Sequence, residues 1–233
     1  MVRKYNKVFV TGDTHLGDVV FNYQDKLVEA IKQDDFDAVI FGGDTFDPWR
    51  GGSVNDILAK YDQLFKFLQK LKSRVIFIAG NHDPNIEVLK KLGFTVRQKF
   101  KYIGSLGERV KIIHGHEFDD ACRRWEFVTK RIAYVENKIN QGLTKINNEA
   151  FIRFMNLVRI NKIDLNRVLN NFRERVGQYR NTDVLVFGHT HSPMTEEQGK
   201  VKFYNWGAWQ KEFGTKPHII IHKDGKLNNI ELQ

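Results

Sequence analysis

VFVTGDTH, from Val8 to His15, joins an apolar run to a glycine and then to two side chains of metal-binding type. The same order returns in AVIFGGDTFD (38–47), VIFIAGNHD (75–83), VKIIHGH (110–116) and VLVFGHTH (184–191). Short, nearly all-apolar runs are typical of strands that are covered on both faces. Each fragment therefore predicts a buried strand that ends at a glycine followed by Asp, Asn or His.

Five such strand ends are expected to bring together a set of polar side chains: Asp13, His15, Asp44, Asn81, His114, His189 and His191. A carboxylate can bridge two divalent ions, an Asn offers a carbonyl oxygen, and imidazole suits Mn, Fe, Zn, Ni or Co. The glycine before each candidate ligand lets the backbone turn sharply toward an ion. The sequence therefore predicts a metal site.

The apolar runs also outline the organisation of the chain. Strands are predicted at Lys7–Thr11, Ala38–Phe41, Val75–Ala79, Val110–His114, Val184–Phe187, Val201–Asn205, His218–His222 and Asn229–Leu232. Helical periodicity is present at Lys26–Gln33, Asn55–Leu71 and Asn85–Leu92. This alternation of strands and helices predicts a layered α/β fold.

Residues 117–180 interrupt this alternation with three apolar stripes at helical spacing, which predict a helical insertion that acts as a lid or cap. Between residues 121 and 180 there are 13 Lys and Arg against five Asp and Glu, which is nearly all of the chain's net charge of +9. A basic segment suits a polyanionic partner such as nucleic acid, a lipid headgroup or a phosphorylated metabolite, and equally a solvated helix surface.

Composition and length bound the class of protein. A chain of 233 residues with 41% hydrophobic residues can bury one core, so residues 1–233 are expected to form a single domain. No apolar run approaches the ~18 residues of a membrane-spanning helix. The N-terminal residues lack the features of a signal peptide, and one cysteine suits a reducing compartment, so a cytoplasmic protein is expected.

The blocks GDTH, GGDTFD, GNHD, HGH and GHTH, in this order, resemble the signature of the calcineurin-like metallophosphoesterases. They span residues 12–191. The resemblance implies a four-layer αββα sandwich with the site at the strand ends. It also implies one metal ion held by Asp13, His15, Asp44 and His191, and a second held by Asp44, Asn81, His114 and His189, with Asp44 as the bridge.

The resemblance further assigns two catalytic residues, His82 and the acid that orients it, Asp83. Two bridged cations, Mn²⁺ in the first place and otherwise Zn²⁺, Fe²⁺, Ni²⁺ or Co²⁺, would turn a water molecule into a hydroxide that attacks phosphorus. His82 would support the transition state or protonate the leaving oxygen. We therefore expect a phosphoester hydrolase that uses two metal ions, and a phosphodiesterase or pyrophosphohydrolase rather than a monoesterase.

Three other functions stay open at this point. The position of the insertion is similar to that of UDP-2,3-diacylglucosamine hydrolases, which cut a nucleotide-linked lipid, although that subgroup commonly has Arg where this chain has His82. The basic insertion beside a two-metal site would also suit a nuclease acting on DNA or RNA. Some members of the fold are scaffolds without activity, such as the retromer subunit.

Contacts to the substrate are expected from His116, Arg123, Arg124 and Trp209. His116 lies two residues past His114, and Trp209 belongs to an NWGAW stretch similar to a strand near the family's active site. Asp47 is expected to cap a loop, and Asp119 to begin the helical insertion.

Overall fold

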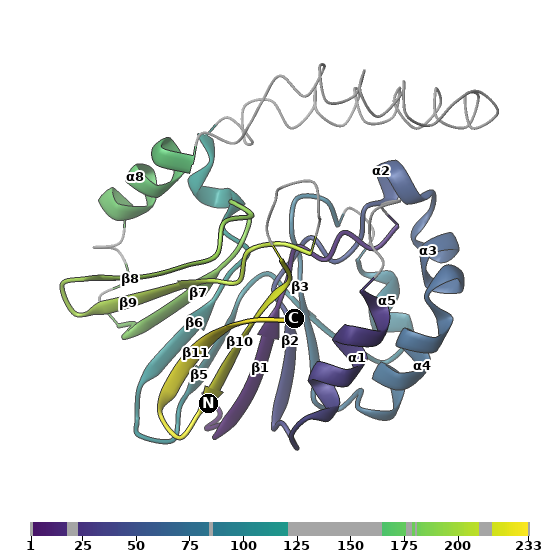
Figure 1. Ribbon diagram of the computed structural model, residues 1–233, viewed down its shortest axis with the longest axis horizontal. Coiled ribbons are helices and arrows are strands. Elements are labelled where there is room, and N and C mark those ends of the chain that lie inside the picture. Colours follow the sequence, from purple (N-terminus) through teal and green to yellow (C-terminus); the bar gives the residue numbers. More distant parts are fainter. Residues whose placement is uncertain are drawn as a thin grey trace.

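The computed structural model describes residues 2–17, 23–83, 86–120, 165–175, 179, 181–209 and 216–232. In this part of the chain two β-sheets pack face to face, and helices lie against their outer faces (Figure 1). The strands are β1 (Lys7–Thr11), β2 (Ala38–Phe41), β3 (Val75–Ile78), β4 (Thr95–Arg97), β5 (Phe100–Ile103), β6 (Arg109–Ile112), β7 (Val184–Phe187), β8 (Met194–Gln198), β9 (Val201–Asn205), β10 (His218–Lys223) and β11 (Lys226–Glu231).

The larger sheet has the order β11-β10-β1-β2-β3-β4, and its strands from β1 to β4 run parallel. In the register, Val8 lies opposite Ala38 and Val39 opposite Val75. The smaller sheet has the order β5-β6-β7-β9-β8, with β6, β7 and β9 parallel. Because the carboxyl ends of parallel strands meet at one edge, each sheet delivers its strand ends to one side of the molecule.

The helices are α1 (Gln24–Lys32), α2 (Pro48–Gly51), α3 (Val54–Lys60), α4 (Asp62–Lys70), α5 (Val88–Lys91), the 3₁₀ turn η1 (His116–Phe118) and α8 (Leu165–Arg175). Leu64, Phe65 and Leu68 form the buried face of α4, at the three- and four-residue spacing of an amphipathic helix. Ser53 begins α3 with a capping box, since its side chain accepts from the Asp56 N–H and the Asp56 carboxylate accepts from the Ser53 N–H.

Three apolar cores separate the layers. One lies between the large sheet and the helices α1 and α3 to α5, a second between the two sheets, and a third between the small sheet and α8. In the third core, the ring of Phe172 on α8 stacks on Phe187 of β7 at 4.5 Å and meets Phe203 of β9 edge-on at 4.8 Å. Helix, sheet, sheet and helix follow in that order, so the αββα sandwich is confirmed.

Several element boundaries differ from the sequence prediction. The helix predicted over Asn55–Leu71 is two helices, because Tyr61 leaves helical geometry with φ −105° and ψ 31°. The strands β4, β5 and β8 and the short helix α2 were not predicted. Of the predicted insertion at 117–180, η1 in part and α8 are described, whereas residues 121–164 lie outside the described residues. None of the described helices has the length and apolar composition needed to cross a lipid bilayer.

Candidate metal centre

The residues after β1, β2 and β7 leave their strands in a left-handed backbone conformation. Six described non-glycine residues have a positive φ of this kind, and five are candidate ligands: Asp13, His15, Asp44, His189 and His191. Such a conformation costs about 1–3 kcal/mol per residue and persists only where the surroundings enforce it, often at functional sites. The backbone strain of the described chain is therefore concentrated at the strand ends where the two sheets meet.

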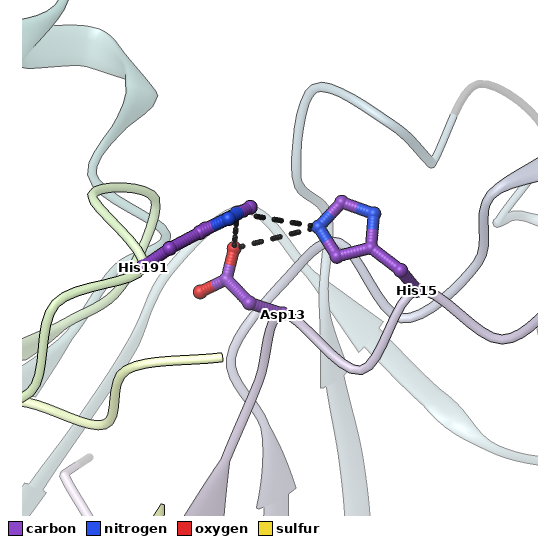
Figure 2. Close-up of side chains that lie close together, drawn as sticks. All are labelled: Asp13, His15 and His191. Atoms are coloured by element: carbon purple, nitrogen blue, oxygen red, sulfur yellow. Dashed lines mark hydrogen bonds and ion pairs between the residues drawn. The ribbon is translucent and has the colours of Figure 1, made fainter. Parts of the chain in front are cut away.

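Asp13, His15 and His191 form the first group (Figure 2). Oδ1 of Asp13 lies 3.3 Å from Nε2 of His191 and 3.9 Å from Nε2 of His15, and the two Nε2 atoms are 3.3 Å apart. All three side chains are nearly buried, with 0%, 2% and 11% of the side chain exposed. Three potential donor atoms thus face one another at the end of β1 and of β7.

Asp44, His114 and His189 form the second group, to which Asn81 adds an oxygen. Nε2 of His114 lies 3.2 Å from Oδ2 of Asp44 and 3.1 Å from Oδ1 of Asn81. Oδ2 of Asp44 also lies 4.0 Å from Nε2 of His15 in the first group. Asp44 is therefore the carboxylate that lies between the two groups.

Each central carboxylate has one oxygen held by N–H donors and the other directed at imidazoles. Oδ2 of Asp13 accepts from the indole N–H of Trp206 at 2.7 Å and from the backbone N–H of His189 at 3.0 Å. Oδ1 of Asp44 accepts from the backbone N–H of His82 at 2.7 Å. This division fixes both carboxylates while leaving Oδ1 of Asp13 and Oδ2 of Asp44 for a cation.

Trp206 occupies a slot that only glycines leave open. A Cβ on Gly12, Gly42 or Gly188 would lie 2.6, 2.2 or 2.4 Å from the indole ring, and one on Gly188 would also lie 2.1 Å from Oδ2 of Asp13. Such separations are shorter than any side chain can tolerate without displacing its neighbours. The glycines of the sequence blocks are therefore needed for the approach of Trp206 to Asp13.

The donor set fits divalent metal ions. Ligand atoms that lie about 2.1 Å from a shared ion are separated by about 3.0–3.4 Å. Two of the three distances in the first group are 3.3 Å, and His114 of the second group lies 3.2 Å from Asp44 and 3.1 Å from Asn81. Oδ1 of Asp13, which is directed into the first group, is buried and makes no hydrogen bond within the described structure. Carboxylate oxygens, an amide oxygen and imidazoles together suit the borderline transition metals.

The pKa shifts of Asp44 and His114 in the metal-free protein indicate that the site favours a positive charge. Burial opposes the charged form of Asp44, but the charges of His114 and His82 outweigh it and hold the pKa of Asp44 well below its usual range. Burial likewise lowers the pKa of His114, but the Asp44 carboxylate reverses this and raises the pKa to about 9. In the absence of metal, a bound proton thus supplies the positive charge that the carboxylates require.

His82 lies beside the first group, with 25% of its side chain exposed. The acid expected to orient it, Asp83, is 4% exposed and accepts instead from the backbone N–H groups of Thr45, Phe46 and Gly80. Burial, followed by the nearby Asp44 carboxylate, raises the pKa of Asp83 to about 6. We therefore infer that Asp83 links the loop after β3, to which it belongs, to the loop after β2.

Among the residues that the structure describes, the acid with an oxygen within 4.0 Å of the His82 ring is Asp47, for which the sequence predicts a loop cap. Oδ1 of Asp47 lies 3.9 Å from Nδ1 of His82, and Oδ2 lies 3.7 Å from Nδ1 of His15. Asp47 is 1% exposed, so its carboxylate is directed inward. Its place three residues after Asp44, in GGDTFD, was the signal that could have identified it.

The expected substrate contacts differ in their placement. The ring of His116 is partly exposed and lies 5.3 Å from that of His114, beside the second group. Trp209 is fully buried, its indole N–H donates to the Thr11 hydroxyl at 2.7 Å, and its role is therefore to support β1 rather than to contact substrate. Arg123 and Arg124 lie outside the described residues.

Comparisons with known proteins agree with this fold. Residues 6–193 match the model of the calcineurin-like phosphoesterase family. The structure is similar to Yfce, a phosphoesterase from E. coli (16% identity, 97% of this chain and 100% of that chain, TM-score 0.52). It is also similar to an archaeal phosphodiesterase (18% identity, 97% of this chain and 99% of that chain, TM-score 0.55). A third similar structure is Vps29 from Chaetomium thermophilum (12% identity, 92% of this chain and 80% of that chain, TM-score 0.50). No curated protein sequence matches the chain. At these identities the structural likenesses show the fold alone.

Proposed function

This chain belongs to the calcineurin-like phosphoesterase family, and from that premise we propose that it hydrolyses phosphoesters with two divalent metal ions. The observation that carries the proposal is the orientation of Asp13 and Asp44. Each holds one oxygen against N–H donors and presents the other to imidazole nitrogens at 3.2–3.3 Å. Two buried carboxylates that each direct an oxygen at several buried imidazoles are typical of a metal site and not of an ion pair that only stabilises the fold.

In this proposal each ion has four protein ligands. Asp13, His15, Asp44 and His191 would hold the first, and Asp44, Asn81, His114 and His189 would hold the second, so that Asp44 would be shared. Mn²⁺ is the favoured ion, and Zn²⁺, Fe²⁺, Ni²⁺ or Co²⁺ also suit these donors. When bound, the ions would lower the pKa of a water molecule and neutralise the charge of the phosphoester.

His82 is the proposed acid for the leaving group. Its backbone N–H is fixed by Asp44, and its partly exposed ring reaches the surface that a substrate would occupy. Oδ1 of Asp47 lies 3.9 Å from Nδ1 of that ring and would hold its orientation. His82 can therefore donate a proton to the departing oxygen while Asp47 keeps the ring in place.

A phosphodiester or a pyrophosphate is the proposed substrate class. The basic residues of the 121–180 segment would favour a polyanion, so a nuclease acting on DNA or RNA is the second candidate. A nucleotide-linked lipid of the UDP-2,3-diacylglucosamine kind is the third. The scaffold role is disfavoured because the inward-facing oxygens of Asp13 and Asp44 serve no purpose in a surface that only binds protein.

Hydrolysis by metal-stripped protein resupplied with Mn²⁺ tests the proposal. We expect bis-p-nitrophenyl phosphate to be cleaved faster than the monoester p-nitrophenyl phosphate, with both activities lost in Asp44→Asn. Asp183→Asn is the matched control, because Asp183 pairs with Arg109 at the opposite end of β7. Turnover that needs no metal would refute the proposal, as would an active Asp44→Asn protein.

Salt dependence separates the candidate substrates. If nucleic acid is the substrate, its affinity must fall steeply as salt rises, since Lys and Arg would displace counterions from several phosphates. A flat salt dependence of binding to single- or double-stranded DNA and RNA would exclude a nuclease function. Cleavage of a nucleotide pyrophosphate with the same protein would then favour the pyrophosphohydrolase.

A further inference from the structure

We propose that Asp119 is a positioning residue that orients His189 for the second metal ion. Oδ2 of Asp119 lies 3.2 Å from Nε2 of His189, and both side chains are buried, at 7% and 6% exposure. The resemblance that assigns the ligands gives Asp119 no role. The inference rests on the proposed function, because His189 needs a fixed orientation only if it holds a metal ion.

The contact decides which ring nitrogen of His189 is available. A neutral imidazole has one N–H and one lone pair. With its Nε2–H donated to Asp119, His189 keeps the lone pair on Nδ1, the nitrogen that remains for an ion in the second group. A carboxylate bound to the outer nitrogen also makes the ring a stronger ligand, which is the usual purpose of such a partner.

The backbone of His189 is fixed independently of its ring. Its N–H donates to Oδ2 of Asp13 at 3.0 Å, and its φ of 68° lies in the left-handed region. This leaves rotation of the side chain as the main freedom of the residue. Asp119 restricts the rotation of the side chain and selects the tautomer of the ring. It therefore fixes the part of His189 that the backbone contacts leave free.

Asp119 is itself held on both sides by α8. Asn171 donates to the Phe118 carbonyl at 3.2 Å, and Arg175 donates to the Glu117 carbonyl at 3.2 Å and to the Asp120 carboxylate at 3.1 Å. These donors hold the main chain immediately before Asp119 and the side chain of the residue immediately after it. A buried carboxylate on a chain held at both neighbouring residues is well suited to determine the geometry of a ligand.

The same helix contacts the strand that leads to His189. Phe172 of α8 packs on Phe118 at 4.9 Å and on Phe187 at 4.5 Å, and Phe187 is the last residue of β7, two positions before His189. One helix thus holds the segments that carry both members of the Asp119–His189 pair. Their separation is therefore set by packing as well as by the hydrogen bond between them.

The test is Asp119→Asn, which keeps the size of the side chain and removes its charge. Titration calorimetry of the metal-stripped protein with Mn²⁺ should show one site unchanged and the other weakened about 10–100-fold. Asp183→Asn, at the far end of β7, should leave both sites unchanged. Unaltered binding in Asp119→Asn, or equal weakening of both sites, would overturn the inference.

A second readout needs no metal. In the metal-free protein, nitrogen NMR of the imidazoles should show His189 with its proton on Nε2, and Asp119→Asn should change this to a mixture of tautomers. His189 without a preferred tautomer in the unsubstituted protein would overturn the inference. A further outcome separates the two proposals. If the unsubstituted protein bound no metal while His189 kept the Nε2–H tautomer, the proposed function would be refuted, whereas the orientation of His189 by Asp119 would be supported.

Discussion

The indole N–H of Trp206 donates to Oδ2 of Asp13 over 2.7 Å, and this contact leaves Oδ1 of Asp13 facing His191. The contact joins the segment after β9 to the end of β1, which belong to different sheets. Trp206, which is not itself a metal ligand, thus determines which oxygen of Asp13 is directed at the candidate metal site.

Trp206→Phe should therefore weaken metal binding at the first site. Phenylalanine keeps an aromatic ring between the glycines but lacks the donor, so Asp13 loses one of the two hydrogen bonds on Oδ2. Loss of such a supporting contact costs about 10–100-fold in metal affinity. Calorimetric titration with Mn²⁺ measures it.

Trp209→Phe is the matched control for this change. It removes an indole N–H that is equally buried but donates to Thr11 instead of Asp13. Its affinity for metal should stay near that of the unsubstituted protein. Equal losses of metal affinity in the two variants would show that the effect comes from packing and not from the bond to Asp13.

His82→Ala should keep its metal and lose most of its turnover. General acid catalysis contributes typically about 10²–10⁴-fold, and the candidate metal ligands remain in place when the ring is removed. Asp47→Asn should lower turnover in the same direction. Metal content by mass spectrometry and kcat on a diester with a poor leaving group give the two readouts. Full activity of His82→Ala would remove His82 from the mechanism.

His222 should make stability depend on pH at the end of the sandwich away from the metal centre. Its ring is buried, with Nδ1 2.7 Å from the Tyr102 hydroxyl and Nε2 2.6 Å from Oε1 of Glu108. Burial lowers the pKa of His222 and outweighs the opposing charge of Glu108. In the pH range below the ordinary histidine value of about 6.5, the unfolded chain therefore binds more protons than the folded protein.

It follows that this contribution to stability is present above about pH 6.5 and is lost as the pH falls. His222→Gln lacks it, so the difference in unfolding free energy between the two proteins should shrink between about pH 8 and pH 5.5. Urea unfolding at several pH values measures the difference. A constant or growing difference toward low pH would contradict the assignment.

The sequence predicted the bounds of β1, β2, β7 and β9 as the structure has them. In β2 and β7 every residue is apolar and buried, because these strands are covered on both faces, whereas β9 has an exposed Lys202. The missed strands β4, β5 and β8 are all edge strands of their sheets. Met194–Gln198 is largely exposed and contains two glutamates, so no apolar run marks it. An edge strand pairs with only one neighbouring strand, and the local sequence does not show that such a neighbour exists.

The break at Tyr61 has a similar cause. Ile57 and Leu64 keep their buried positions on either side of it, so the apolar spacing continues through a point where the helix ends and restarts. Periodicity records which face of a segment is buried and is insensitive to one residue of altered ψ.

At the metal centre, the sequence identified the candidate ligands but not the residues that support them. Ligands follow strand ends at fixed spacing and are visible as GDTH or GHTH. Asp119 reaches His189 from another part of the chain, so no local spacing marks it. Trp206 lies in the NWGAW stretch that is expected near the site, but the sequence does not show that its indole reaches Asp13. The family resemblance assigns Asp83 to the orientation of His82, whereas in the structure its carboxylate accepts from backbone N–H groups.

Diffraction from crystals soaked in Mn²⁺, recorded at the manganese absorption edge, tests most directly whether Asp44 bridges two metal ions. If both ions bind as proposed, two anomalous peaks should appear about 3.5–4 Å apart. One should lie beside Asp13, His15 and His191, the other beside Asn81, His114 and His189, with Asp44 touching both. A single peak, or two peaks that do not share Asp44, would contradict the bridging role of Asp44.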